Sequence, residues 1–170
     1  WVTDNQLPVT VKSQLALELA KAAGPAGMVA GQARDIEGTG GHLTLDQLRY
    51  LHRQKTGALL RYAVLAGGII TAQPAAVQQL LAQFGSSYGL AFQIYDDLMD
   101  VVGTTTTMAK RVGEHAAEHK NTYPGLLGVT GAEEQLQQAL ERAKNAQAAL
   151  SQLTGRSFAA YDDFLAYFKL

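Results

Sequence analysis

The segment at residues 84–103, FGSSYGLAFQIYDDLMDVVG, combines an apolar helical pattern with three aspartates. Successive residues of a helix turn by about 100°, so Gln93, Asp96, Asp97 and Asp100 are expected on one face. The apolar residues of the other face are expected to pack into a core. Because burying an unpaired carboxylate costs several kcal/mol, the pattern predicts cations close to these aspartates.

Helix signals extend from this segment in both directions, whereas the period-two alternation of strands is absent. Thr44 with Gln47 and Thr130 with Glu133 have the spacing of capping boxes, so a helix is expected to begin at each threonine. Gly155 is expected to end the second of these helices. The predicted helices cover residues 10–36 with a break at 24–25, 44–66, 74–102, 130–154 and a short segment after 161. The sequence therefore predicts an all-α protein.

The composition excludes several classes of protein. The chain has 170 residues, of which 47% are hydrophobic, which is enough for the core of one domain. A formal net charge of -1 gives no overall field that would attract nucleic acid. The absence of cysteine excludes disulfides and thiolate zinc sites and is compatible with a cytoplasmic location. The longest apolar run, residues 58–70, is too short for a membrane span and contains Arg61, so no membrane insertion is expected.

The aspartate face at residues 93–100 offers hard oxygen ligands without cysteine or histidine, which favours Mg²⁺ over zinc or copper. Magnesium keeps several of its waters and bridges to the phosphates of a substrate. The alternative interpretation is a solvated acidic helix face that binds nothing. Polar groups elsewhere in the chain decide between the two interpretations.

Two earlier segments carry groups suited to a phosphate or a metal. His52, Lys55 and Thr56 are expected on one helical face, and a lysine next to a hydroxyl suits a phosphate oxygen. Gln32 and Asp35 are also expected to share a face, beside a glycine that permits close packing. Taken alone, each group is equally compatible with a surface patch.

The longest irregular stretch covers residues 103–125 and is rich in threonine, glycine and charge, which is typical of a functional loop. Lys110, Arg111 and Lys120 within it are candidate phosphate contacts. The motif KNTYP at residues 120–124 is expected to be a rigid point where the loop returns to the core. A solvated basic loop is the alternative.

Taken in order, these pieces resemble the C-terminal half of a trans-type polyprenyl diphosphate synthase, the family of the farnesyl and geranylgeranyl diphosphate synthases. The matching text lies between residues 24 and 128 and reads GMVAGQARDI, LHRQKTGALLRYAV, FGSSYGLAFQIYDDLMDVVG, AKRVGEH and KNTYPGLLG. The combination of KTGAL, an FQI.DD..D segment and KNTYP is specific to this family.

The resemblance implies an all-α helical bundle of the isoprenoid-synthase type, lacking its N-terminal helices. Residues 1–170 would then be the C-terminal part of a single polyprenyl synthase domain. The family has a first aspartate-rich motif N-terminal to the region matched here, and no second DDxxD occurs in the chain. The resemblance therefore also implies a fragment of a longer synthase, inactive alone, whose complete form is a cytoplasmic homodimer.

The resemblance assigns the site residues to three groups. The first surrounds the reacting end of the substrate, the second contacts its diphosphate, and the third holds Mg²⁺. The first group is Lys55, Thr56, Gln93 and Lys110. The second is Lys55, Lys110 and Lys120. The third is Asp96, Asp97, Asp100 and Asp35. Two positions depart from the family pattern: Ala109 stands before Lys110 where glycine is common, and His115 stands where aspartate is common.

By the same resemblance, the reaction is the condensation of an allylic prenyl diphosphate with isopentenyl diphosphate. The alternative is a non-catalytic regulatory or partner subunit that keeps the fold. A terpene cyclase relative is a third interpretation, although cyclases rarely carry the KTGAL and KNTYP elements.

Overall fold

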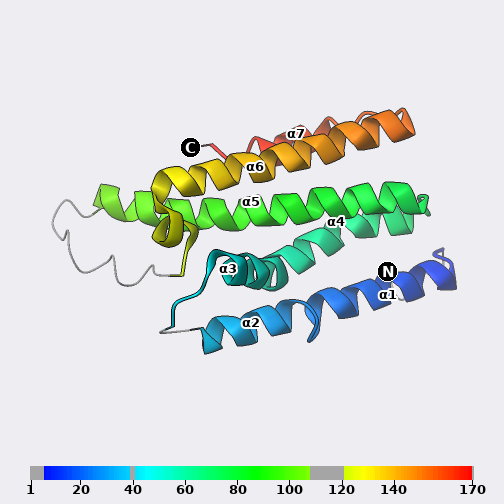
Figure 1. Ribbon diagram of the computed structural model, residues 1–170. Coiled ribbons are helices and arrows are strands. Elements are labelled where there is room, and N and C mark those ends of the chain that lie inside the picture. The colour runs from blue at the N-terminus through cyan, green and yellow to red at the C-terminus, as the bar shows by residue number, and fades with distance from the viewer. Residues whose placement is uncertain (1–5, 39–40, 108–120, 170) are drawn as a thin grey trace.

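A computed structural model of the chain describes residues 6–38, 41–107 and 121–169. These residues contain helices and no strand, so the predicted all-α class is confirmed for them (Figure 1). In chain order the elements are α1 (Val9–Ala23), α2 (Met28–Glu37), α3 (Leu45–His52), the π-helical turn η1 (Arg53–Gly57), α4 (Ala58–Ile70), α5 (Ala75–Thr107), α6 (Tyr123–Thr154) and α7 (Ala160–Leu165).

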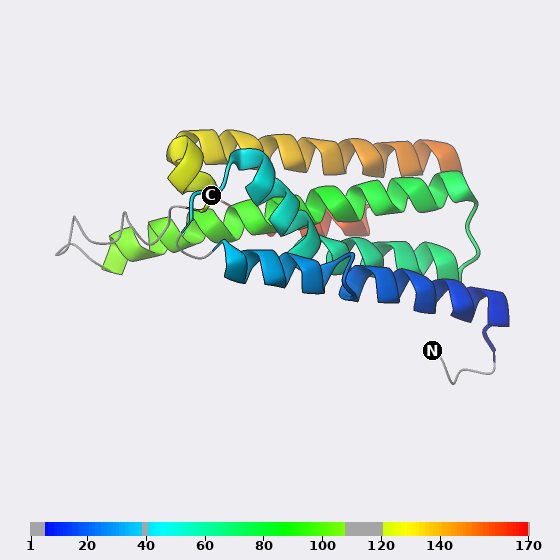
Figure 2. The ribbon, with the colours of Figure 1, turned by 60° about the horizontal axis from the view of Figure 1, so that its bottom comes forward.

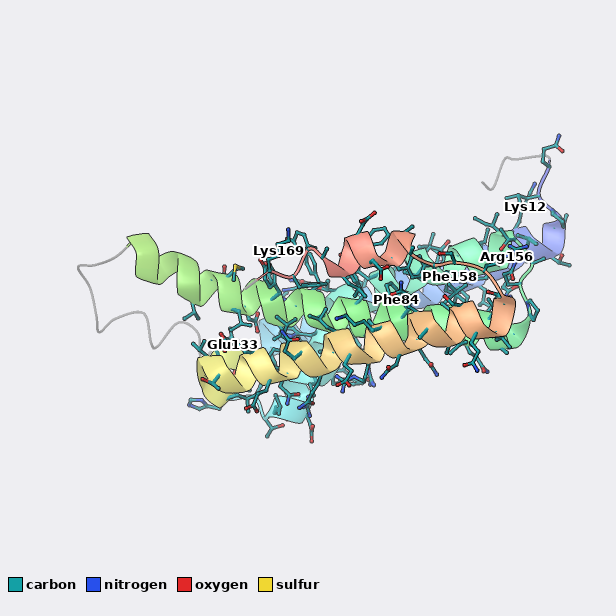
Figure 3. All side chains as sticks on the ribbon, turned by 90° about the horizontal axis from the view of Figure 1, so that it is seen from above. Lys12, Phe84, Glu133, Arg156, Phe158 and Lys169 are labelled. Atoms are coloured by element: carbon teal, nitrogen blue, oxygen red, sulfur yellow. The ribbon has the colours of Figure 1, made fainter. Side chains whose placement is uncertain are left out.

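Helix α5 occupies the middle of a helical bundle, between α6 on one side and α4 on the other (Figures 1 and 2). Helix α1 packs on α4, and α2 continues from α1 to contact η1. The chain after Arg156 turns back, and Figure 3 shows α7 lying along α5. Helix α2 therefore contacts η1, and η1 in turn contacts α5.

The main core lies between α5 and α6. Phe84, Ile94 and Leu98 of α5 pack there with Leu136 of α6, and each is nearly inaccessible to solvent. Aromatic rings extend this core towards α7, since the ring of Phe84 lies 4.4 Å from that of Tyr161. Within the described residues, no helix combines the length and the apolar character that a bilayer crossing requires.

Several predicted boundaries are confirmed because they depend on local hydrogen bonds. The Thr44 hydroxyl accepts from the Gln47 amide while the Gln47 side chain accepts from the Thr44 amide, which is the predicted capping box. Gly155 ends α6 in the left-handed conformation, with φ of 66°. Helices α1 and α2 are separated at Gly24 and the residues that follow, as expected.

Three predicted boundaries are wrong. Helix α4 runs through Gly67 and Gly68 to Ile70. A Cβ on Gly68 would collide with the side chain of Leu81, so this glycine permits a close contact between helices and does not end α4. Helix α5 continues past residue 103 to Thr107. Helix α6 begins at Tyr123, capped by the Thr122 hydroxyl, and is interrupted at Gly128 before it reaches residue 130.

Candidate active site

The segment with Lys55 and Thr56 forms a π-helical turn, η1, between α3 and α4. A continuous α-helix was predicted here, and this prediction is wrong. A π-turn closes its hydrogen bonds over five residues and changes the register of the side chains that follow it. His52 consequently points into the core while Lys55 and Thr56 stay half-exposed, so the three side chains do not share one face.

Lys55 pairs with Asp35, which comes from α2. The Lys55 Nζ lies 2.6 Å from the Asp35 Oδ2, and both side chains retain about 40% of their exposure, at 37% and 42%. Gly31 brings the two backbones together, because a Cβ there would lie only 2.5 Å from the Lys55 Cα. The predicted close packing at this glycine is therefore confirmed, and it places a carboxylate and an ammonium side by side at the surface.

Replacing Gly31 with alanine should lower the free energy of unfolding by about 1–3 kcal/mol, because backbone on α2 must move away from backbone on η1. Gly67→Ala is the matched control, since a Cβ at that helical position meets nothing within 4 Å. The control should gain about 0.5–1 kcal/mol from reduced unfolded-state freedom. Urea denaturation of both variants measures the difference, and equal effects would contradict the close approach.

Thr56 pairs with Gln93, which lies one turn before Asp96 on α5. The Thr56 hydroxyl donates to the Gln93 Oε1 over 2.9 Å. Glycines again allow this approach, because a Cβ on Gly89 would lie 2.9 Å from the Gly57 Cα. The turn η1 is thus held between α2 and α5, with Lys55 directed to one helix and Thr56 to the other.

The three aspartates of α5 do not all face the same way. Asp96 and Asp100 are exposed, four residues and about one turn apart. Asp97 is buried, with 7% of its surface exposed, and its Oδ2 accepts a hydrogen bond from the Tyr123 amide over 2.9 Å. The expected convergence on one face therefore holds for two carboxylates, and the third ties α5 to the start of α6.

Burial raises the pKa of the Asp97 carboxyl from 3.8 to about 6. Hydrogen bonds from the Tyr123 amide and the Gln93 side chain lower the pKa, and the charges of Asp96 and Asp100 raise it. Asp97 thus carries a costly charge at neutral pH. Perturbed carboxyls of this kind are enriched at functional sites.

His52 is the other buried titratable group near η1. Its ring centroid lies 5.7 Å from that of Tyr123, and none of the described residues hydrogen-bonds to its Nδ1. The pKa of His52 is lowered to about 4, chiefly by burial and also by the charge of Lys55, whereas the charge of Asp35 acts to raise it. The imidazole is therefore neutral at pH 7 and packs beneath the site.

The donor set at the surface of α5 suits Mg²⁺. Within residues 6–38, 41–107 and 121–169, no three acidic or histidine side chains form a cluster that could hold a metal ion. Magnesium, however, is commonly bound through one or two carboxylates together with substrate phosphates. Asp96 and Asp100 provide such a pair of hard oxygen ligands.

Five of the residues singled out from the sequence lie outside the described residues, namely Ala109, Lys110, Arg111, His115 and Lys120. Two features of the site were missed from the sequence: the π-turn and the amide of Tyr123 as a partner of Asp97. The only sequence signal for the second was the KNTYP motif, whose Tyr123 and Pro124 are buried at the start of α6.

The chain matches the family model described as polyprenyl synthetase over residues 10–168. It is 46% identical over 143 residues to the farnesyl diphosphate synthase of Geobacillus stearothermophilus, an alignment that covers 84% of this chain and 48% of that protein. It is 42% identical over 141 residues to the farnesyl diphosphate synthase of Escherichia coli K12, with 82% of this chain and 46% of that protein covered. The chain thus spans about half the length of the curated relatives it matches.

Solved structures agree with these sequence matches. A FPP/GFPP synthase from Zymomonas mobilis has a TM-score of 0.77 at 29% identity, over 95% of this chain and 52% of that one. A geranyltransferase from Helicobacter pylori, complexed with magnesium and isoprenyl diphosphate, has a TM-score of 0.75 at 26% identity, over 98% of this chain and 54% of that one.

Proposed function

From the premise that this chain belongs to the polyprenyl synthetase family, we propose that it contributes the C-terminal half of a magnesium-dependent prenyltransferase domain. The substrates are an allylic prenyl diphosphate and isopentenyl diphosphate, and the product is a longer prenyl diphosphate. The observation that carries the proposal is the surface on which the Lys55–Asp35 pair, the Thr56–Gln93 pair and two exposed aspartates occupy η1 and the adjoining helices.

Each group on this surface has a role in binding a diphosphate. Lys55 is a compact cation suited to a phosphate oxygen, and Asp35 holds it in place over 2.6 Å. Asp96 and Asp100 would hold Mg²⁺ together with the phosphates of the substrate, and Asp35 is proposed to join them once the diphosphate is bound. Asp97 supports their helix from within. When bound, Mg²⁺ supplies positive charge that stabilises the departing diphosphate. Lys110 and Lys120 are proposed as further diphosphate contacts.

The reaction needs no nucleophilic side chain. The carbon–oxygen bond of the allylic diphosphate breaks, and both bonding electrons leave with the diphosphate. The double bond of isopentenyl diphosphate attacks the resulting allylic cation and forms the new carbon–carbon bond, after which a proton passes to the departing diphosphate. The Thr56–Gln93 pair is proposed to line the reacting end, where preorganised dipoles stabilise charge without reorganising.

In the complete synthase, Lys55→Ala should raise the KM for the allylic diphosphate by about tenfold, since a hydrogen bond to a charged group contributes about 1.5–3 kcal/mol. The KM for isopentenyl diphosphate should change much less. Lys21→Ala is the matched control, because Lys21 forms an exposed ion pair with Glu18 over 2.8 Å on α1. Steady-state kinetics with each substrate varied separately gives the comparison. Equal changes in the KM of both substrates would contradict a specific contact of Lys55 with the allylic diphosphate.

We also propose that the complete enzyme is a cytoplasmic homodimer. Helices α1 and α2 expose apolar side chains that are available for such an association, with Leu17, Val29 and Ile36 exposing 55%, 52% and 65% of their surfaces. Sedimentation equilibrium of the complete enzyme tests this, and a monomer at micromolar concentration would contradict it.

A further inference from the structure

Asn121 connects two parts of the chain that are distant in sequence. Its Oδ1 accepts a hydrogen bond from the Leu43 amide over 2.8 Å. Its Nδ2 donates to the Gly41 carbonyl over 3.0 Å and to the Gly38 carbonyl over 3.3 Å. Gly38 is the residue that ends α2, and Leu43 directly precedes the cap of α3. Both donors of this side-chain amide are therefore used to fix the turn from α2 to α3 against the start of α6.

The same short segment also holds α5. Two residues after Asn121, the backbone amide of Tyr123 donates to the buried carboxyl of Asp97, and the Tyr123 ring is fully buried. Between them, the Thr122 hydroxyl caps α6. We call residues 121–123 the clasp, because they bind the end of α2 on one side and α5 on the other.

The end of α2 depends on polar contacts of this kind. Gly31 is the one buried residue of α2, and it lies about two turns before Gly38. Ile36, in the last turn, is 65% exposed. Charged side chains attach this half of α2 elsewhere, with Asp35 on Lys55 and with Arg34 on Gln54 and over the Tyr50 ring. Apolar burial contributes little here, so the loss of the Asn121 contacts should free the end of α2 directly.

The clasp joins the two elements that carry the proposed ligands. Asp35 lies three residues before Gly38, and Asp96 is adjacent to Asp97. A metal and diphosphate site requires its ligands to keep a fixed separation, and outer residues that orient ligands typically contribute about 10–100-fold to metal affinity or activity.

We propose that Asn121 is a positioning residue of the diphosphate site, which holds the Asp35 end of α2 at a fixed place relative to the aspartates of α5. This inference rests on the proposed function of that surface. Asn121 acts through the backbone of the α2–α3 turn and touches neither the metal nor the substrate.

The test compares Asn121→Ala with Asn145→Ala in the complete synthase. Asn145 is an exposed asparagine on α6, so its loss removes the same side chain without a contact to α2. Asn121→Ala should raise the Mg²⁺ concentration for half-maximal rate by about tenfold, with kcat at saturating Mg²⁺ changing much less. Asn121→Asp is nearly isosteric and keeps an oxygen for the Leu43 amide, so it should fold and show the same direction of change.

Amide hydrogen exchange separates this inference from the proposed function. In Asn121→Ala, exchange at Leu43 and Tyr123 should become faster, while Asn145→Ala should leave both amides unchanged. If these amides exchange faster in Asn121→Ala but the parent protein has no prenyltransferase activity, the proposed function is rejected while the contacts of the clasp are supported. In an active enzyme, an unchanged Mg²⁺ requirement, or a kcat loss without a change in that requirement, would overturn the positioning role.

Discussion

Replacing Asp96 with asparagine should lower the turnover of the complete synthase by about a hundredfold to a thousandfold, with little change in stability. The side chain is exposed on α5 and makes none of the core contacts of its neighbours Ile94 and Leu98. Its proposed partner is Mg²⁺, whose charge stabilises the departing diphosphate by several kcal/mol. Asparagine keeps the shape and one oxygen but removes the negative charge.

Glu134→Gln is the matched control for this substitution, because it makes the same change of carboxylate to amide at an exposed position on α6. Turnover measured over a range of Mg²⁺ concentrations, together with urea denaturation, distinguishes a metal ligand from a structural residue. If Asp96→Asn kept the rate and the Mg²⁺ dependence of the parent enzyme, Asp96 would not be a metal ligand.

Replacing Asp97 with asparagine should have a large effect of a different kind, an increase of about 2–3 kcal/mol in the free energy of unfolding at pH 8. The pKa of Asp97 is about 6 in the folded chain against an ordinary 3.8, and each unit corresponds to about 1.4 kcal/mol. Asparagine carries no charge to bury, and its oxygen can still accept from the Tyr123 amide. A gain in stability on removing this carboxylate would show the common compromise in which a functional group lowers the stability of the fold.

The sign of the pH dependence follows from proton binding. Between about pH 4 and 6 the folded chain holds a proton on Asp97 that the unfolded chain has lost, so this contribution falls as pH rises through 6. His52 acts in the opposite direction. Its pKa is lowered to about 4 in the folded chain, so its contribution is complete above 6.5 and falls on acidification.

The two groups therefore oppose each other between about pH 4 and 6, and the parent chain should show a shallow dependence of stability on pH there. In Asp97→Asn only the His52 contribution remains of these two, so the free energy of unfolding of the variant should fall as pH falls from 6.5 to 4. Urea denaturation at several pH values in the presence of a chelator measures both curves. A variant that is less stable than the parent at pH 8 would show that the Asp97 charge is compensated in the folded chain.

The helices that could be located from the sequence are those whose ends carry local hydrogen bonds. The Thr44 cap and the Gly155 stop depend on atoms within a few residues, so their sequence signature is sufficient. Gly67 and Gly68 were expected to end a helix, but packing against Leu81 uses the small size of Gly68 inside the helix. Tertiary contacts override propensity at such positions.

The site was predicted as a set of residue types, and its pairing was not. Lys55 finds its partner 20 residues away in Asp35, and Thr56 finds Gln93 37 residues away. Helical periodicity relates residues of one helix, so it cannot predict contacts between residues this far apart in the sequence. It also placed Asp97 on the same face as its neighbours, although the adjacent residue of a helix is turned by about 100° and here reaches the Tyr123 amide.

The most direct measurement is an incubation of the complete synthase with an allylic prenyl diphosphate and labelled isopentenyl diphosphate, with and without Mg²⁺. The expected result is a longer labelled prenyl diphosphate that requires Mg²⁺, and no product from residues 1–170 alone. If the complete protein leaves isopentenyl diphosphate unconsumed while Mg²⁺ and the allylic substrate are present, the surface formed by Lys55, Thr56, Gln93 and the aspartates does not perform prenyl transfer.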